Sequence, residues 1–487
     1  MHTITVYLSK KEAVIPYLNG NMTGSRAVRN TANFLIRNVY TALGKTEDIR
    51  TPKENSVLLK VCMCLREANL RKEEQHRKKL KEGSEHRLHL FQIPDEEHRY
   101  LSYEQIDAVL KYSEDPAYYS CTSQVNQQAI RKTCQSWKAY FQSLKAWKED
   151  PASFTGKPHI PGYIQTEKAT AHFTSQVSQL IEVGKGFYLG FSNTKDRVFL
   201  GKMPVHGKYV KTEVSPRCEG CVLKITFDAG EILPEVPKEP KRIMAVDPGT
   251  NNFAACVTNT GMRPFLIDGR HLKSVNQFFN KELAEKRAHL TKGSNPEDRT
   301  IRRTSRRIEK LSEKRERIIR DYFYKAAHEI CRRAAAEKVE LILYGHNKGQ
   351  KQEIGIGRVN NQNFVQIPFE RFFHVLRWIA AKYGIAVTMA EESYTSKADF
   401  LSDDVIPVYG KEKGEPTFSG KRIRRGLYRS GNGQIFNADV NGAANILRKH
   451  YASQAEQISW KELSSVEKVG YGELYPAKVR YKAGKAA

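Results

Sequence analysis

Two aspartates at the edges of predicted elements are the residues of this sequence that could do chemistry together. Asp247 ends the apolar run RIMAV, and Asp439 lies in FNADVNGAANIL, where apolar residues recur at helical spacing. Hard divalent ions bind oxygen ligands, and two Mg²⁺ ions about 3.5–4 Å apart can clamp the attacking water and the leaving oxygen of a phosphodiester. If the fold brings these carboxylates together with a third acid, the predicted chemistry is metal-assisted hydrolysis or transfer at a phosphodiester.

Each aspartate also has an ordinary structural interpretation. Asp247 starts an Asp-Pro-Gly sequence, which is first of all a turn signal. Asp439 suits the N-cap or the first turn of a helix, where an acid interacts well with the helix dipole. The catalytic interpretation therefore depends on whether the two residues lie on suitable elements of one fold.

The elements around these residues predict a particular order of strands and helices. Two tight turns join the first three predicted strands, which are therefore antiparallel neighbours. An Arg-rich helical region, a strand, a helix between Pro368 and Gly384, another strand and a last helix follow. The order βββαβαβα is that of an RNase H-like fold, with acids on the first strand, near the fourth or fifth strand and at the last helix. The strands are predicted at 242–246, 252–258, 263–267, 339–343 and 385–390, and the last helix at 439–449.

The N-terminal half has a different character. Residues 1–15 alternate like a strand, and residues 25–150 are mostly helical and rich in basic side chains. Short apolar or alternating stretches then predict a small β-barrel or sheet, and three prolines amid charges mark a linker at 233–241. The helical region is either a lobe that grips nucleic-acid phosphates or an ordinary bundle with a charged exterior.

The composition indicates a polyanionic partner. The 487 residues include 80 Lys and Arg against 54 Asp and Glu, a formal net charge of +26, which suggests DNA or RNA. A merely solvated basic surface is the alternative. No apolar run is long enough to span a membrane, there is no signal-peptide pattern, and eight mostly scattered Cys make no disulfide framework, so we expect a reducing cytoplasm.

Four segments of the C-terminal half carry a family resemblance. AVDPGTNNFAAC, GHNKGQKQE, the stretch from NNQNFVQ to TSKADF, and FNADVNGAANIL are similar to the three RuvC blocks of the TnpB nucleases and the miniature type V CRISPR effectors. The resemblance implies an α/β and α+β multidomain protein. It would have an RNase H-like (RuvC) nuclease domain, an N-terminal helical recognition lobe and a small β-barrel (wedge-like) domain. Asp247 and Asp439 match the first and third catalytic acids of the family.

The resemblance also predicts the domain bounds. The wedge-like β domain would consist of two segments with the recognition lobe between them, and a basic, cysteine-free insertion would interrupt the RuvC domain. The predicted bounds are 1–20 and 157–233 for the β domain, 21–156 for the recognition lobe, 234–394 and 435–455 for the RuvC domain, 395–434 for the insertion and 456–487 for a basic C-terminal tail.

The family's middle acid is missing from its usual place. That glutamate ends the fourth strand in most members, whereas residues 343–346 of this sequence are LYGH. Glu391 and Glu392 are the first candidates to replace it, because the fifth strand lies beside the fourth and can end in the same crevice. Side chains alternate along a strand, so only one of the two should bind metal, and we favour Glu392. Glu353 is the alternative; otherwise all three are surface acids and the site is inactive.

The second departure from the family concerns zinc. Members commonly carry two CxxC pairs before the last aspartate, but residues 394–437 contain no Cys, and the CxxC at 218–221 has no second pair, so we expect no zinc site. The basic loop at 421–434 and a basic helix at 299–320 could still contact phosphates, or both could simply be solvated. The candidate nucleic-acid-binding residues are Arg302, Arg303, Arg306, Arg307, Lys310, Lys397, Arg422, Arg424 and Arg425.

The function that the resemblance implies is that of an RNA-guided DNA endonuclease. A guide RNA and target double-stranded DNA would be its partners, and Asp247, Glu392 and Asp439 would hold two Mg²⁺ ions in a single RuvC site. The protein would act as a monomer or as a homodimer on one RNA, in the prokaryotic cytoplasm near the nucleoid and away from any membrane. Two other interpretations stay open: an RNA-guided DNA binder with an inactive nuclease site, and a guide-free, structure-selective nuclease.

Overall fold

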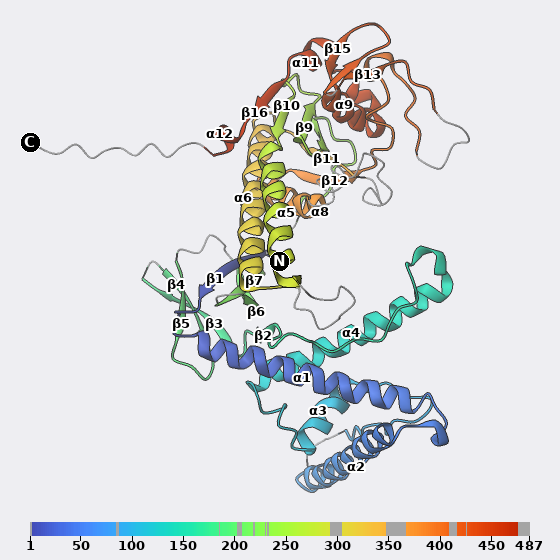
Figure 1. Ribbon diagram of the computed structural model, residues 1–487, viewed down its shortest axis with the longest axis vertical. Coiled ribbons are helices and arrows are strands. Elements are labelled where there is room, and N and C mark those ends of the chain that lie inside the picture. Colours follow the sequence, from blue (N-terminus) through green and yellow to red (C-terminus); the bar gives the residue numbers. More distant parts are fainter. Residues whose placement is uncertain are drawn as a thin grey trace, which may run out of the picture. The chain divides into compact units, whose positions relative to one another are not determined.

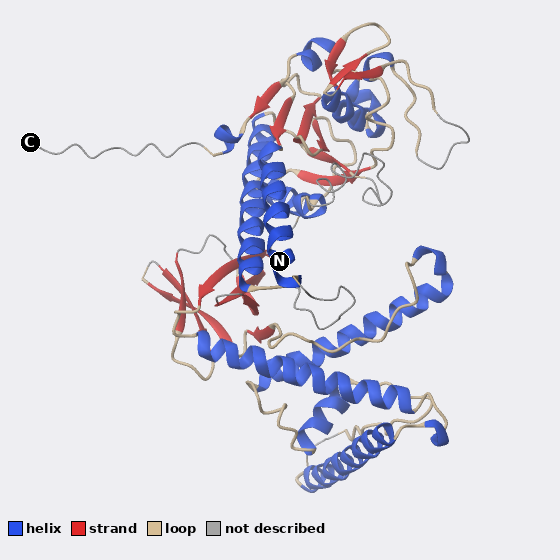
Figure 2. Cartoon of the chain, viewed as in Figure 1, coloured by secondary structure: helices blue, strands red, loops and turns tan. Residues whose placement is uncertain are grey.

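The computed structural model of the chain divides into two compact units, Met1–Glu231 and Ile232–Ala487 (Figure 1). Helices and strands occur in both units, as Figure 2 shows. Each unit has its own hydrophobic clusters. The structure describes residues 2–83, 87–184, 186–201, 207–217, 220–228, 230, 233–292, 304–346, 367–408, 416–424 and 426–475.

Four helices build the helical part of the first unit. Capping boxes at Thr51 and Ser102 fix where the second and third of them begin, because each hydroxyl accepts the backbone N–H three residues on. Trp137 is fully buried in this part, and its indole N–H donates to Asn33 at 2.9 Å. The helices are α1 (Ile15–Ala42), α2 (Pro52–Lys81), α3 (Tyr103–Tyr112) and α4 (Ser123–Glu149), with the 3₁₀ turns η1 (Glu47–Ile49) and η2 (Pro151–Ser153).

Two antiparallel sheets form the β part of the first unit. Their strand orders are β1-β7-β6-β2 and β3-β4-β5, and β1 pairs with β7 from the other end of the unit. The described strands do not pair into one closed sheet, so the expected barrel is not confirmed. The strands are β1 (His2–Ser9), β2 (Ala171–Thr174), β3 (Ser178–Val183), β4 (Gly186–Phe191), β5 (Arg197–Gly201), β6 (Lys208–Arg217) and β7 (Gly220–Asp228).

A six-stranded mixed sheet with the order β12-β11-β8-β9-β10-β16 is the centre of the second unit. Strands β8, β9 and β10 are antiparallel neighbours, and β11 and β12 run parallel to β8. Three antiparallel strands followed by two parallel ones is the order expected from the sequence. The strands are β8 (Ile243–Pro248), β9 (Asn252–Thr258), β10 (Phe265–Asp268), β11 (Leu341–Gly345), β12 (Ala386–Ala390) and β16 (Glu467–Val469).

Helices cover both faces of this sheet, because its central strands are apolar on both sides. On one face, α6 (Arg306–Ala336) and α8 (Phe369–Ala381) pack against side chains such as Met244 of β8, and α5 (Arg270–Thr291) runs beside α6 (Figure 1). On the other face, α9 (Ala438–His450) packs against Ala245 of β8 and its neighbours. The carboxyl end of β8, where Asp247 stands, is therefore flanked by a helical layer on each side.

The C-terminal part of the second unit contains further short elements. The 3₁₀ turn η3 (Phe400–Ser402) precedes a small antiparallel sheet of β13 (Lys421–Arg424), β14 (Leu427–Arg429) and β15 (Ile435–Asn437), and α10 (Ala452–Ala455) follows α9. The segment expected to be a basic tail is partly folded into α11 (Trp460–Ser464), β16 and α12 (Tyr471–Leu474). The reason is that Leu463, Val469 and Leu474 bury apolar side chains, while β16 pairs in parallel with β10.

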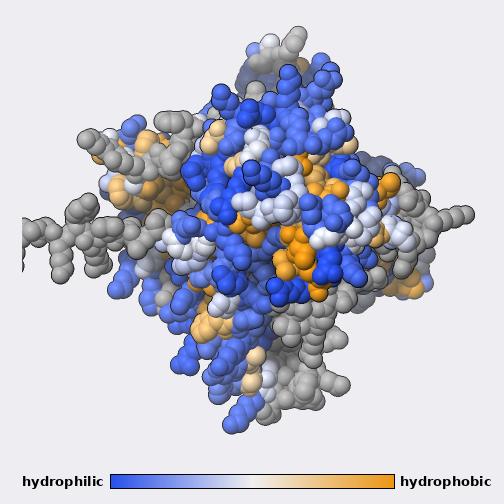
Figure 3. Space-filling view, turned by 90° about the horizontal axis from the view of Figure 1, so that it is seen from above, coloured by the Kyte–Doolittle hydropathy of each residue, from blue (hydrophilic) through white to orange (hydrophobic). Residues whose placement is uncertain are grey.

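The surface that faces the viewer in Figure 3 is mostly hydrophilic, with scattered hydrophobic patches. This agrees with a sequence in which 28% of the residues are charged. Among the described helices, none combines the length and the apolar character that crossing a membrane requires.

Candidate active site

Three neighbouring strands end at one edge of the six-stranded sheet, and two of them carry acidic residues there. β8, β11 and β12 run parallel and in register, so their carboxyl ends lie side by side. Asp247 stands at the end of β8, and Glu391 and Glu392 directly follow β12. β11 lies between them and ends in Gly345. The position without an acid at the end of β11 is therefore flanked by acids on both neighbouring strands.

Gly345 leaves the space that the Glu392 carboxylate occupies. A Cβ at Gly345 would clash with Oε2 of Glu392 and would lie 2.7 Å from Cδ1 of Ile446. Glu392 itself is buried, with 8% of its surface exposed. A side chain on residue 345 would thus exclude the glutamate from the edge of the sheet, and its absence lets Glu392 reach across β11 toward β8.

Helix α9 brings Asp439 to the same place. Asn437 caps this helix, because its Oδ1 accepts the backbone N–H groups of Asp439 and Val440 at 2.9 and 3.2 Å, so the Asp439 carboxylate is not needed as the cap. Gly442 follows one turn later, and a Cβ there would lie 2.6 Å from Oδ2 of Asp247. The helix can approach β8 this closely because residue 442 has no side chain.

The three carboxylates interact electrostatically. Burial raises the pKa of Asp247 well above its ordinary value, and the charges of Glu392 and Asp439 raise it further, while Arg422 acts in the opposite direction. A cation at this point would relieve that repulsion, and three carboxylates are the oxygen donors that Mg²⁺ takes in proteins. Asp247, Glu392 and Asp439 are therefore residues of the chemical type that could hold magnesium.

Asp439 makes two polar contacts of its own. Nδ2 of Asn252 donates to Oδ2 of Asp439 at 2.6 Å, and Nη2 of Arg422, on β13, lies 3.3 Å from Oδ1. With the side chains in these positions, no three His, Cys, Asp or Glu of the described part of the chain enclose a metal position. An ion bound here would have to compete with Arg422 for Asp439.

Glu391 and Glu392 have different partners. The Oε2 of Glu391 lies 2.5 Å from Nζ of Lys449 on α9, and its Oε1 accepts the backbone N–H of Ser393 at 2.7 Å. Glu391 is thus engaged away from Asp247. Four of the candidate residues lie outside the described part of the chain: Glu353, Arg302, Arg303 and Arg425.

Three of the described basic candidates belong to the insertion before α9. Arg422 contacts Asp439, and Arg424 is exposed two residues further along the same strand. Lys397 is also exposed, with its Nζ 5.9 Å from the centre of the Tyr394 ring. Arg422 is therefore the candidate that the structure brings to the carboxylates.

The other described candidates occupy the first turns of α6. Arg306, Arg307 and Lys310 are exposed there, after the N-cap Ser305. The helix packs on the sheet through its later residues, 319–334. These three cations are thus not part of the carboxylate group.

Three contributing positions were not singled out from the sequence. Gly345 and Gly442 provide space, and Asn252 holds Asp439. A usable signal existed for Gly442, because a glycine inside a helix costs about 1 kcal/mol relative to alanine and so points to a close approach. No comparable signal marked Asn252, whose partner is distant in the chain.

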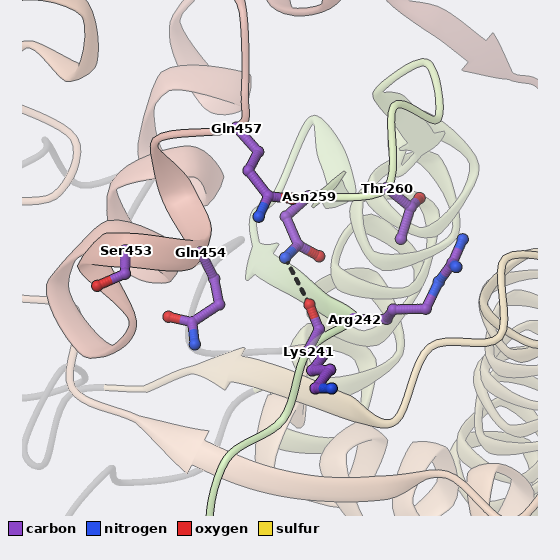
Figure 4. Close-up of a pocket in the computed structure, with 7 residues that line it drawn as sticks. All are labelled: Lys241, Arg242, Asn259, Thr260, Ser453, Gln454 and Gln457. Atoms are coloured by element: carbon purple, nitrogen blue, oxygen red, sulfur yellow. Dashed lines mark hydrogen bonds between the residues drawn. The ribbon is translucent and has the colours of Figure 1, made fainter.

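A polar pocket lies at the other end of β8, where the strand begins (Figure 4). Its volume is about 500 Å³, and in the figure Asn259 points toward the backbone of Lys241. Nδ2 of Asn259 donates to that carbonyl at 2.8 Å, and its Oδ1 accepts the N–H of Ile243, also at 2.8 Å. These bonds tie the start of β8 to the residue that follows β9, which is a structural role. The lining residues are Lys241, Arg242, Asn259, Thr260, Ser453, Gln454 and Gln457.

Several solved structures are similar to the chain. They include the Cas12f1–sgRNA–target DNA complex (14% identity, TM-score 0.42, covering 79% of this chain and 80% of that chain). The CRISPR–Cas12f ternary complex has 14% identity and a TM-score of 0.28, with coverages of 80% and 81%. C2c1 of Alicyclobacillus acidoterrestris with single-guide RNA has 10% identity and a TM-score of 0.33, with coverages of 86% and 69%. No curated protein matches the chain significantly in sequence.

A family model matches the part of the chain that contains the first acid. Residues 210–350 match the family OrfB_IS605, described as "Probable transposase". This segment includes Asp247 and the AVDPGTNNFAAC motif on which the resemblance was based. The match confirms the resemblance over this segment: the chain is similar to the TnpB family across residues 210–350.

Proposed function

We propose that this chain is an RNA-guided DNA endonuclease that hydrolyses target DNA at the carboxylates of Asp247, Glu392 and Asp439. The observation that carries the proposal is the meeting of these three side chains at one sheet edge, although they come from distant parts of the sequence. The assignment of a guide RNA as partner depends on the resemblance to the TnpB family. The net charge of +26 suits two nucleic-acid partners.

The second unit has the features of an RNase H-like (RuvC) nuclease domain. Its strand order β10-β9-β8-β11-β12, with an acid on the first of these strands in the sequence and another on the last helix, supports this assignment. The helices of the first unit would be the recognition lobe and its sheets the wedge-like domain. Among the basic candidates, Arg424 and Lys397 would contact phosphates near the cut, and Arg307 would contact them on α6.

The residues of the site have distinct tasks in this proposal. Two Mg²⁺ ions held by the three carboxylates would polarise the phosphodiester and activate the attacking water. Asp247, at the end of a central strand, fixes one ligand in the rigid part of the sheet. Asn252 orients the Asp439 carboxylate by donating to its Oδ2, and Arg422 stands within reach of both that carboxylate and a phosphate beside it.

Two neighbouring glutamates give a sharp test. Glu392→Gln removes a charged ligand with almost no change of shape, so we expect plasmid cleavage to fall at least about a hundredfold. Glu391→Gln changes a carboxylate that faces Lys449 and is expected to leave cleavage nearly unchanged. The measurement is the initial rate of cleavage of a target plasmid by each protein with its copurified RNA and Mg²⁺. Equal rates for wild type and Glu392→Gln would contradict the assignment of the third acid.

A guided binder without cleavage is the second candidate. The ion pair between Arg422 and Asp439 and the absence of an acid at the end of β11 favour it. It predicts that the wild type binds target DNA through its RNA but leaves the DNA intact in both Mg²⁺ and Mn²⁺. Cleavage that Asp247→Ala abolishes without loss of binding would exclude the binder, and activity of RNA-free protein would instead indicate a guide-free nuclease.

A further inference from the structure

The sheet β3-β4-β5 of the first unit has one buried face and one open face. The strand register puts Ile181, Tyr188 and Phe199 side by side on the open face. Residues of the opposite parity point the other way and join the hydrophobic cluster of the unit; they are Leu180, Leu189, Phe191 and Val198. The sheet itself is thus fixed in place by its inner side, while its outer side presents aromatic rings.

The two rings on the open face form a pair. Their centres lie 5.0 Å apart with an angle of 46° between the planes, and Phe199 is 61% exposed. Gly186 supports this ring, because a Cβ there would lie 2.7 Å from Cε2 of Phe199. The structure therefore holds an exposed phenylalanine in a defined position against a tyrosine and a glycine. Such an arrangement leaves the apolar face of the Phe199 ring open to a ligand.

A polar, basic hollow adjoins the rings on the same face. It has a volume of about 540 Å³, and Gln179, Lys195 and Arg197 are among the residues that line it. Arg197 pairs across the strands with Gly190, and the side chain of Ile181 covers that glycine. Both cations are exposed, and no ion pair involving either is found within the described ranges.

The acidic groups nearby do not cancel this charge. Asp196 lies between the two cations in sequence, and its Oδ2 accepts the hydroxyl of Thr194 at 3.4 Å; one carboxylate against two cations leaves the balance positive. Glu182 has the parity of Leu180 and so belongs to the opposite face. The open face therefore combines aromatic rings, positive charge and an amide side chain.

We propose that this face binds an unpaired nucleotide of RNA, with the base stacked on Phe199 and Tyr188 and a phosphate beside Lys195 and Arg197. Aromatic side chains on an open sheet, flanked by cations, are how proteins hold single-stranded bases with little sequence preference. Gln179 can both donate to and accept from a base edge or a ribose hydroxyl. The inference rests on the proposed function, which makes the guide RNA a partner with unpaired loops. The DNA strand displaced by the guide is unpaired as well, so the test compares RNA with DNA.

The location of the contact can be tested on the complex as purified. The protein with its copurified RNA is irradiated with ultraviolet light, and the cross-linked peptides are identified by mass spectrometry. We expect a cross-link within residues 187–199. Binding of a short fluorescent oligouridine to the RNA-free protein is then compared for Phe199→Ala, Phe199→Trp and the control Phe278→Ala, which removes a phenylalanine that is 55% exposed on α5.

The variants have distinct expected results. Phe199→Ala should weaken binding about tenfold, Phe199→Trp should restore or exceed wild-type affinity because it still stacks, and Phe278→Ala should bind like wild type. Equal affinity of wild type and Phe199→Ala, together with no cross-link on β4 or β5, would overturn this inference. In that case, RNA cross-links elsewhere on the protein would leave the proposed function intact. Equal affinity for the matching oligodeoxyuridine would overturn the assignment to RNA. A wild type that holds no RNA at all would overturn both.

Discussion

At the scale of single residues, Gly442 controls how closely α9 approaches Asp247. A methyl group on residue 442 would stand 2.6 Å from Oδ2 of Asp247, so Gly442→Ala must turn that carboxylate or shift the helix. We expect cleavage to fall about a hundredfold, because misplacing a reacting group by about 1 Å has that effect. Stability should change by less than about 1 kcal/mol, since alanine's helix propensity offsets the strain. Cleavage rates and thermal unfolding measure the two effects.

Gly20 provides the matched control for this substitution. It also lies inside a helix, α1, but a Cβ there would meet nothing within 4 Å. Gly20→Ala is therefore expected to keep full cleavage and to raise the free energy of unfolding by up to about 1 kcal/mol. Wild-type cleavage by Gly442→Ala would show that the close approach of α9 is not needed for catalysis.

The acids themselves could be predicted from the sequence, but their polar partners could not. Strand periodicity predicted that only one of Glu391 and Glu392 faces the crevice; in the structure Glu391 contacts Lys449, while Glu392 lies against Gly345. The partners of Asp439 are separated from it by 187 residues for Asn252 and 17 for Arg422. No local pattern encodes such contacts, because they arise only when the sheet and the insertion fold against α9.

At the scale of elements, a buried carboxylate joins the small β13-β14-β15 sheet to the segment before it. Asp399 is fully buried, and its Oδ2 accepts the hydroxyls of Ser402 at 2.7 Å and Ser430 at 2.6 Å and the N–H of Gly431 at 2.7 Å. One side chain thus joins η3 to the turn between β14 and β15. These hydrogen bonds, two of them from serine hydroxyls, join the two segments.

Removal of that carboxylate should loosen the small sheet. Asp399→Ala leaves several buried donors unsatisfied, so we expect a loss of about 2–4 kcal/mol in the free energy of unfolding. Asp403→Ala changes a neighbouring acid whose side chain is 92% exposed and is expected to have little effect. Urea unfolding with and without EDTA gives both measurements. Unfolding of the wild type by EDTA alone would contradict a sheet held without metal.

The pairing of β2 with β6 carries a pH-sensitive contact. His172 and then Lys211 hold the pKa of Glu213 at about 2 against the effect of burial, with Nζ of Lys211 2.7 Å from Oε1. Because the folded pKa is depressed, the stabilisation is complete above about pH 4.5 and is lost as the pH falls toward 2. With screening of a side chain that is 25% exposed, we expect about 1 kcal/mol.

Glu213→Gln tests this contact. The variant lacks the titrating group, so its free energy of unfolding should fall less than that of the wild type between about pH 5 and pH 3. Glu182→Gln, on the neighbouring sheet, should follow the wild-type curve. Parallel curves for wild type and Glu213→Gln would mean that the ion pair adds nothing to stability.

Elements with strong local patterns were predictable, and those defined by distant partners were not. The strand at 252–258 was predicted with the bounds of β9, and the helix at 439–449 differs from α9 by one residue at each end. β16 was missed because three residues carry too short a pattern, and only the pairing with β10 makes them a strand. The same holds for β13, whose four residues are all exposed and show no apolar alternation.

At the scale of the whole molecule, the net charge of +26 predicts the salt dependence of RNA binding. Each phosphate that a Lys or Arg neutralises releases counterions, so the logarithm of affinity should fall linearly with the logarithm of salt concentration. With about 6–10 phosphate contacts, affinity should drop about 10³–10⁵-fold between 50 and 200 mM salt. Arg307→Gln combined with Arg424→Gln removes two exposed cations from different elements and should make the slope shallower by about two, without a change in sequence preference. Fluorescence anisotropy over a series of salt concentrations measures both slopes, and an affinity independent of salt would show that the excess charge is only a solvated surface.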